Sequence, residues 1–363
     1  MRRWRRSALA ATLACGAGCA FPPSAAWAEP PLDAIAATPG PRWGHELARQ
    51  SPDPAVRFGR LPNGLRYALQ HNETPVDGVA MRLRIGAGSL HERDGEEGLA
   101  HFLEHMAFRG SANVADGEVV RLLQRQGLVY GADTNALTDF NQTVYWFNFP
   151  RADTASLDVG LLLFREIGER LTLDPQLVEQ EKAVVLSEAR LRDVPEQQAE
   201  MAELNNLWAG TLVPRRWSMG LEASVQAATA EKLRRYYRAN YRPDNATLVV
   251  VGRIDVDALE RQIRERFVDW HSDGQADPLD IGAAQGAQPA VEFVSDGVGE
   301  TLSLAWTQPP TAGPSGVAPD RERLATQAAL AVLNAKPLER ASQPTCPYVF
   351  YKIQLVNDRS SWS

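Results

Sequence analysis

Alternating hydrophobic and polar positions predict that the folded part of the chain opens with β-structure. Residues 79–85 read Val-Ala-Met-Arg-Leu-Arg-Ile, which is the pattern of a strand with one buried face. Upstream, Pro62-Asn63-Gly64 separates two runs that contain apolar residues, a signal for a hairpin turn. Further strands are expected at about 129–137, 143–149 and 246–251.

Helical periodicity begins at Gly95 and continues to Phe108. Asp116 is expected to cap a second helix that ends near Gly127, and Asp174 followed by proline is typical of another helix start. Further helices are expected at 154–171, 174–192, about 195–208, 229–240 and 255–268. Because strands and helices come in blocks, the sequence predicts the α+β class, with a mostly antiparallel sheet packed by helices.

Two segments lack any hydrophobic period and divide the chain into modules. Residues 29–52 and 270–288 are rich in small and polar residues and are expected to be linkers. Beyond the second linker, 291–294 and 301–306 are expected to be paired strands and 321–333 a helix, as if the first module began again. The expected organisation is an N-terminal segment (1–28), a linker (29–52), a first module (53–269), a linker (270–288), the start of a second module (289–340) and an aberrant or truncated tail (341–363).

The first 28 residues have the composition of a secretory signal. Four arginines lie among the first six residues, followed by an apolar run of small residues and by Ala26-Trp27-Ala28, which is a cleavage signal. We expect cleavage after Ala28 and a periplasmic or secreted protein. No later run is long and apolar enough to predict a membrane span.

The charge balance argues against a nucleic-acid partner. The chain has 38 Lys+Arg against 45 Asp+Glu, a formal net charge of -7. Beyond the first six residues there is no cluster of basic residues, so the electrostatic footprint of a nucleic-acid-binding protein is missing.

The segment His101-Phe102-Leu103-Glu104-His105 carries the strongest chemical signal. On a helix, His101, Glu104 and His105 share one face, and the apolar residues lie almost opposite. Two imidazoles four residues apart can hold Zn²⁺, and a carboxylate on the same face can take a proton from water. The competing interpretation is a pair of exposed or capping histidines on an amphipathic helix.

A catalytic zinc site needs a third protein ligand, and the helix predicted at 174–192 offers two candidates. Glu181 and Glu188 both fall in its apolar stripe, where an unpaired carboxylate is costly. The competing interpretation is a buried ion pair with an arginine such as Arg165. Helix geometry alone leaves the choice between the two glutamates open.

Taken together, these motifs resemble the pitrilysin/insulinase family of zinc metallopeptidases, and the arrangement is similar to its bacterial periplasmic members. The similarity covers about Val56 to Val268 and continues more weakly to about Arg340. The matching motifs are Gly86-Ala87-Gly88-Ser89 with Glu92, Gly98 to Met106, Asn135-Ala136 with Thr138, Thr143 and Tyr145, Glu181 seven residues before Glu188, Pro214-Arg215, and Tyr237 with Tyr241 to Asn245 and Val251-Gly252.

The resemblance implies a role for each candidate residue. His101, His105 and Glu188 would bind one Zn²⁺ per chain, Glu104 would be the general base on a zinc-bound water, and Glu181 would support the site from outside the ligand set. Asn135 and Ala136 would lie on an edge strand along which an extended peptide substrate is bound.

We therefore expect a zinc-dependent endopeptidase that hydrolyses extended peptides or unfolded segments outside the cytoplasm. Members of the family consist of four similar modules, whereas this chain is expected to contain one complete zinc-binding peptidase module (53–269) and part of a second, non-catalytic module (289–340). One alternative is accordingly a zinc-binding but inactive fragment, or a subunit that requires the missing C-terminal half or a separate peptidase-like chain. A second alternative is a peptide-binding module without hydrolytic activity.

Overall fold

The structure is a computed structural model that describes residues 43–341 apart from 49–50, 75, 130, 273, 286–291, 297–301 and 305–316. The predicted signal peptide and the residues after 341 lie outside the described residues, as does most of the predicted first linker. The boundaries of the predicted domains stay predictions.

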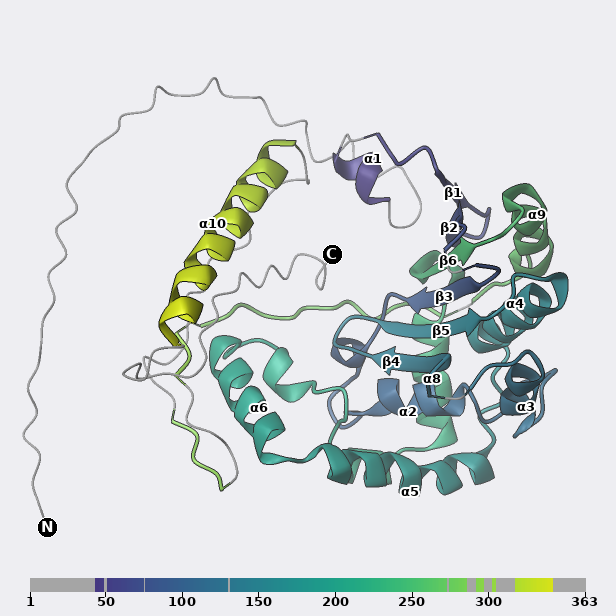
Figure 1. Ribbon diagram of the computed structural model, residues 1–363. Helices are drawn as coiled ribbons and strands as arrows, with labels where there is room; N and C mark the ends of the chain where they lie inside the picture. The colour runs from purple at the N-terminus through teal and green to yellow at the C-terminus, as the bar shows by residue number, and fades with distance from the viewer. Residues whose placement is uncertain are drawn as a thin grey trace, which may run out of the picture. The chain divides into compact units, whose positions relative to one another are not determined.

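A six-stranded sheet forms the centre of the described part (Figure 1), with strands in the order β1-β2-β6-β3-β5-β4. Neighbouring strands are antiparallel except β2 and β6, which are parallel. The expected α+β class with a mostly antiparallel sheet is confirmed. The strands are β1 (Val56–Arg60), β2 (Arg66–His71), β3 (Val79–Ile85), β4 (Thr134–Thr138), β5 (Thr143–Phe149) and β6 (Ala246–Gly252).

The strand predicted from the alternation at 79–85 is observed as β3, with one face buried as predicted. Its apolar positions are buried and its intervening positions are half-buried. The hairpin predicted at 62–64 joins β1 to β2, and Gly64 has a φ of +97° there, a conformation that suits glycine. A hydrophobic alternation of this kind fixes which face of each strand meets the core.

Helices pack on one face of this sheet, through the buried side chains of the strands. The rings of Phe147 on β5 and Phe164 on α4 stack with centroids 4.7 Å apart, and the hydroxyl of Tyr145 on β5 bonds that of Tyr241 at the end of α8. The helices are α1 (Gly44–Ala48), α2 (Leu99–Met106), α3 (Glu118–Arg125), α4 (Thr154–Glu169), α5 (Pro175–Arg192), α6 (Pro195–Leu207), α7 (Glu222–Gln226), α8 (Ala230–Asn240), α9 (Val256–Phe267) and α10 (Val317–Ala341), with short 3₁₀ turns η2 (Ser89–His91), η3 (Val213–Arg215) and η4 (Pro243–Asn245).

Two of the predicted capping residues are found at helix starts, and a third is not. Asp174 accepts hydrogen bonds from the first turn of α5, and Asp255 caps α9 in the same way. The prediction that Asp116 caps the second helix is wrong, because Gly117, with a φ of +78°, is the N-cap of α3. The carboxylate of Asp116 instead accepts a hydrogen bond from Arg109.

Three further expectations need correction. A short helix, α1, lies inside the segment expected to be a featureless linker. Residues 292–294 and 302–304, the described parts of the expected strand pair, form no strand, and Val294 and Leu302 are mostly exposed. A two-stranded hairpin without a packed face is marginal in water. The helix expected at 321–333 lies within the longer α10.

The second predicted linker is irregular, as expected, but parts of it are attached to the module. The backbone of Ile281 accepts a hydrogen bond from Leu212, and Gln285 donates one to Ala209. None of the helices in the described part of the chain combines the length and the apolarity that a membrane crossing requires.

Candidate metal centre

Helix α2, which carries the His101 motif, begins on a buried carboxylate. Glu92 is 5% exposed and accepts hydrogen bonds from the backbone N–H groups of Gly98 at 3.0 Å and Ala100 at 2.7 Å. Burial raises the pKa of Glu92 to about 8, against the opposing effect of these two donors. Because the first N–H groups of a helix lack partners within the helix, Glu92 fixes where α2 starts.

The candidate residues of α2 are enclosed by the protein. His101 is 6% and Glu104 9% exposed, and the rings of His101 and His105 lie 4.7 Å apart at an interplanar angle of 81°. The competing interpretation of two exposed histidines is therefore wrong.

Helix α5 packs against α2 (Figure 1). It brings both glutamates to the histidines. The Oε2 atom of Glu188 lies 3.2 Å from Nε2 of His105 and 3.8 Å from Nε2 of His101. Its other oxygen pairs with Arg192 at 2.7 Å. One oxygen of Glu188 therefore faces both imidazoles.

Glu181 lies on the other side of the His105 ring. Its Oε1 atom is 3.0 Å from Nδ1 of His105, and its Oε2 atom accepts a hydrogen bond from Arg109. The competing interpretation of a buried ion pair with an arginine is therefore confirmed for Glu181, but the partner is Arg109, because Arg165 pairs with Glu169 and Asp269. Glu181 is placed to orient the ring of His105, an arrangement typical of carboxylates behind metal-binding histidines.

The donor set fits a zinc ion. One ligand atom from each of His101, His105 and Glu188 lies within 4.8 Å of the others. Tetrahedral zinc with bonds of about 2.1 Å requires ligand atoms roughly 3.4 Å apart, close to the separations of Glu188 from the two imidazoles. The Nδ1 atom of His101 is buried without a hydrogen-bond partner among the described residues.

Burial and charge act in opposite directions on the two histidines. Burial, aided by the neighbouring His105, lowers the pKa of His101 to about 4, so this imidazole is neutral and has a free lone pair at neutral pH. Burial also lowers the pKa of His105, but the hydrogen bond to Glu181 and the surrounding carboxylates outweigh it and raise that pKa overall.

Glu104, on α2, contacts the edge strand β4 of the sheet. Its Oε2 atom accepts a hydrogen bond from the hydroxyl of Thr138 at 2.5 Å. Burial raises the pKa of Glu104 to about 7, and the hydrogen bond from Thr138 opposes this rise. A carboxyl group with a pKa near neutrality can both accept and return a proton.

Asn135 and Ala136 lie on β4, which is an edge strand, as predicted. The backbone of Asp133 accepts a hydrogen bond from Asn148, and the backbone of Asp139 donates one to Gln142, at the two ends of the pairing between β4 and β5. Hydrogen-bonded and non-hydrogen-bonded residues alternate along an antiparallel strand, so the backbone N–H and C=O groups of Ala136 and Thr138 point away from the sheet. The backbone N–H of Ala136 donates a hydrogen bond of 2.9 Å to the side-chain oxygen of Asn135. A peptide that pairs with this edge would have to replace that contact.

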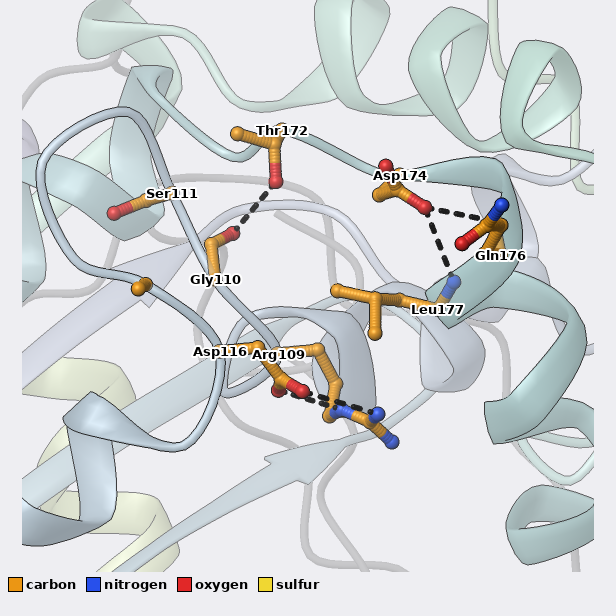
Figure 2. Close-up of a pocket in the computed structure, with 9 residues that line it drawn as sticks. Arg109, Gly110, Ser111, Asp116, Thr172, Asp174, Gln176 and Leu177 are labelled. Atoms are coloured by element: carbon orange, nitrogen blue, oxygen red, sulfur yellow. Dashed lines mark hydrogen bonds and ion pairs between the residues drawn. The ribbon is translucent and has the colours of Figure 1, made fainter.

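A polar pocket of about 400 Å³ opens beside Arg109, the partner of Glu181. Figure 2 shows Arg109 reaching Asp116 and shows Asp174 bonded to the start of α5. The pocket is lined by neither histidine nor by Glu104 or Glu188, so it flanks the candidate centre and does not contain it.

Reasoning from residue types alone missed several residues of the site. Glu92 and Thr138 entered only within the family motifs, without a role, and Arg109 did not enter at all. An acidic residue seven positions before the first residue of a helix could have indicated Glu92. Nothing in the local pattern indicates that Arg109 meets Glu181, because 72 residues separate them.

Comparison with models of protein families tests the family resemblance that the motifs indicate. A model described as Insulinase (Peptidase family M16) matches residues 66–213, and a model described as Peptidase M16 inactive domain matches residues 227–341. The chain belongs to the M16 family. The resemblance to the insulinase and pitrilysin peptidases is thereby confirmed.

Similar M16 proteins include bacterial zinc proteases. The chain is 32% identical over 215 residues to the probable zinc protease PqqL of Haemophilus influenzae, an alignment that covers 59% of this chain and 23% of that protein. It is 35% identical over 203 residues to the probable zinc protease PqqL of Escherichia coli, covering 56% of this chain and 22% of that protein. The chain thus spans less than a quarter of the length of these relatives.

The structure is similar to a solved M16 structure. The crystal structure of the first half of the periplasmic protease PqqL from Escherichia coli aligns with a TM-score of 0.61 and 31% identity, over 64% of this chain and 50% of that chain. This similarity is consistent with the observed sheet and its helical layer.

Proposed function

We propose that this chain carries the catalytic centre of a zinc-dependent endopeptidase. The observation that carries the proposal is the convergence of His101, His105 and Glu188 within 4.8 Å, with Glu104 one turn of helix from His101. His101, His105 and Glu188 would hold one zinc ion per chain. The family membership and the zinc proteases among the relatives support this assignment.

The side chains around the ligands suit hydrolysis of a peptide bond. When bound, zinc supplies Lewis acidity that activates water and stabilises negative charge on the carbonyl oxygen of the substrate. Glu104 would take the proton of the attacking water and return it to the leaving amine. Glu181 would hold His105 through Nδ1, so that Nε2 stays directed at the metal position.

The edge strand supports an extended polypeptide as the substrate. A peptide that adds to β4 would bond the outward backbone groups at Ala136 and Thr138, and Asn135 would be released to contact it. Pairing through the backbone makes few demands on side chains, so an unfolded segment of varied sequence would be accepted.

We further propose that the protein acts outside the cytoplasm, in the periplasm or as a secreted protein. The predicted signal peptide and the periplasmic assignment of Escherichia coli PqqL support this location. Because the chain spans less than a quarter of its curated relatives, efficient hydrolysis would further require a second half or a partner chain that encloses the substrate.

Substitution of Glu104 tests the proposed function. In Glu104→Gln the amide keeps the shape of the side chain but cannot accept the proton, so zinc should be retained while hydrolysis of an unstructured fluorogenic peptide falls at least about 100-fold. Glu118→Gln, on the surface of α3, is the matched control and should keep the wild-type rate. If Glu104→Gln cleaves at the wild-type rate, the general-base role is wrong. If both the wild type and Glu104→Gln bind the peptide and neither of them cleaves it, a peptide-binding module is favoured.

A further inference from the structure

One hydrogen bond connects the edge strand directly to the proposed general base. Thr138 is the last residue of β4, and its hydroxyl donates to Oε2 of Glu104. Both residues are buried, with 6% and 9% of their surface exposed. The contact is therefore made inside the protein, where a hydrogen bond to a carboxylate is strong.

This contact distinguishes the two oxygens of Glu104. Oε2 is held by Thr138, whereas Oε1 makes no hydrogen bond within the described part of the chain. The terminal torsion of a glutamate side chain is broad and has no strong preference of its own. An external contact to one oxygen therefore sets the direction of the other.

The position of Thr138 is itself fixed from two sides. It pairs with Thr143 of β5, and the turn that follows accepts backbone hydrogen bonds from Ser89 and Leu90 in η2. Gly88 permits this close packing, since a Cβ there would lie 1.9 Å from the backbone oxygen of Asp139. The hydroxyl of Thr138 is thus presented by a rigid strand end.

Resting on the proposed function, we propose that Thr138 is a positioning residue for catalysis. Its hydroxyl fixes the rotation of the Glu104 carboxylate, so that Oε1 is the oxygen that takes the proton from the attacking water. The outward backbone groups of Thr138 belong to the edge on which the substrate would pair. The same residue therefore sets the geometry of the base relative to the bound peptide.

Three substitutions on β4 test this role in the full chain loaded with zinc. Single-turnover cleavage of a fluorogenic peptide, with protein in excess, gives a maximal rate and a half-saturating concentration. Thr138→Val, which keeps the shape and loses the hydroxyl, should lower the maximal rate about 10-fold to 100-fold and leave the half-saturating concentration and the zinc content unchanged. Thr138→Ser should restore the rate to within about threefold, because it keeps the donor.

Thr134 provides the matched control. It lies on the same strand and the same face, is fully buried, and its hydroxyl has no hydrogen-bond partner among the described residues. Thr134→Val should leave the maximal rate unchanged. Equal losses in Thr134→Val and Thr138→Val, or a Thr138→Ser variant as slow as Thr138→Val, would show that Thr138 has only a structural role.

A double-mutant cycle measures the contact without any hydrolysis. The unfolding equilibrium constants of Thr138→Val, Glu104→Gln and the double variant should deviate from additivity by at least about threefold, while the cycle of Thr134→Val with Glu104→Gln should be additive. If the wild type does not hydrolyse peptides but the first cycle shows coupling, the proposed function fails and the contact stands. Additivity in the first cycle overturns the inference whatever the activity.

Discussion

At the scale of single residues, the centre depends on carboxylates that are buried together with their donors. Glu92, Glu104 and Glu181 are each less than one tenth exposed. Glu92 is bonded by backbone N–H groups, Glu104 by Thr138, and Glu181 by Arg109 and His105. Each donor offsets the cost of burying a carboxylate, so removal of either partner should be costly.

Glu92 offers a direct test of this dependence. In Glu92→Ala the N–H groups of Gly98 and Ala100 lose their buried acceptor, so the free energy of unfolding should fall by about 1–3 kcal/mol. Urea denaturation measures the change. Glu179→Ala, which removes an exposed partner of Lys182, is the control and should cost at most about 0.5 kcal/mol. Equal effects of the two substitutions would contradict the capping role of Glu92.

At the scale of elements, contacts outside the candidate metal centre hold the segment that follows α2. The loop after α2 is fastened to α4 by Glu166, which accepts hydrogen bonds from the backbone and side chain of Asn113 at 3.1 and 2.8 Å and pairs with Arg170 at 3.2 Å. The loop that follows the metal-binding motif is therefore anchored to the helical layer.

Glu166 should make stability depend on pH in the acid range. Burial raises its pKa, but the hydrogen bonds from Asn113 and the contact with Arg170 outweigh burial, and the pKa is lowered from its usual 4.5. A lowered folded-state pKa adds stability above the unfolded-state pKa, and this stability is lost as the pH falls through the folded-state value.

Glu166→Gln should therefore lower the free energy of unfolding by about 1–3 kcal/mol at pH 7 and by clearly less at an acid pH below the folded-state pKa, where the wild-type carboxylate is itself protonated. Urea denaturation across this pH range measures the difference. A deficit that is equally large at both pH values would show that the charge of Glu166 is unimportant.

Sequence patterns predicted the elements much better than the contacts between them. The alternation at 79–85 and the caps at Asp174 and Asp255 are local signals, and they gave strands and helices close to those observed. The burial of His101 and the pairing of Glu181 with Arg109 depend on residues far away in the sequence. Glu181 and Glu188 are separable only once the position of α5 against α2 is known, because both lie on similar helix faces.

At the scale of the whole molecule, the chain corresponds to a small part of its relatives. It covers 26% of the structure of the complete periplasmic protease PqqL from Escherichia coli. Contacts from the remaining parts of such a protein can position a substrate that the centre alone does not hold. In the proposed function, the residues that would cleave the peptide bond and the parts of the protein that would enclose the substrate can therefore be tested separately.

Turnover by this chain alone should accordingly be slow. On one unstructured peptide, we expect kcat/KM at least about 100-fold below that of complete PqqL, because substrate positioning of this kind is worth about that factor. Parallel assays with equal zinc loading measure the ratio. A rate equal to that of PqqL would show that the described module suffices.

Export is a second prediction at the scale of the whole molecule. We expect the protein to be recovered outside the cytoplasm with Glu29 at its N-terminus, because Ala26-Trp27-Ala28 provides the cleavage signal. N-terminal sequencing after expression in a bacterium with a periplasm decides this. A cytosolic protein that retains its first 28 residues would contradict the predicted location.

The metal content of ligand variants tests the central claim most directly. Elemental analysis of the purified chain should find about one zinc per molecule, and His101→Ala and Glu188→Gln should lose it. Glu181→Gln, on the same helix, should retain zinc with an affinity about 10-fold to 100-fold lower, because it only orients His105. Full zinc retention by Glu188→Gln together with loss in Glu181→Gln would reverse the assignment of the third ligand, and full retention by His101→Ala would contradict the proposed centre altogether.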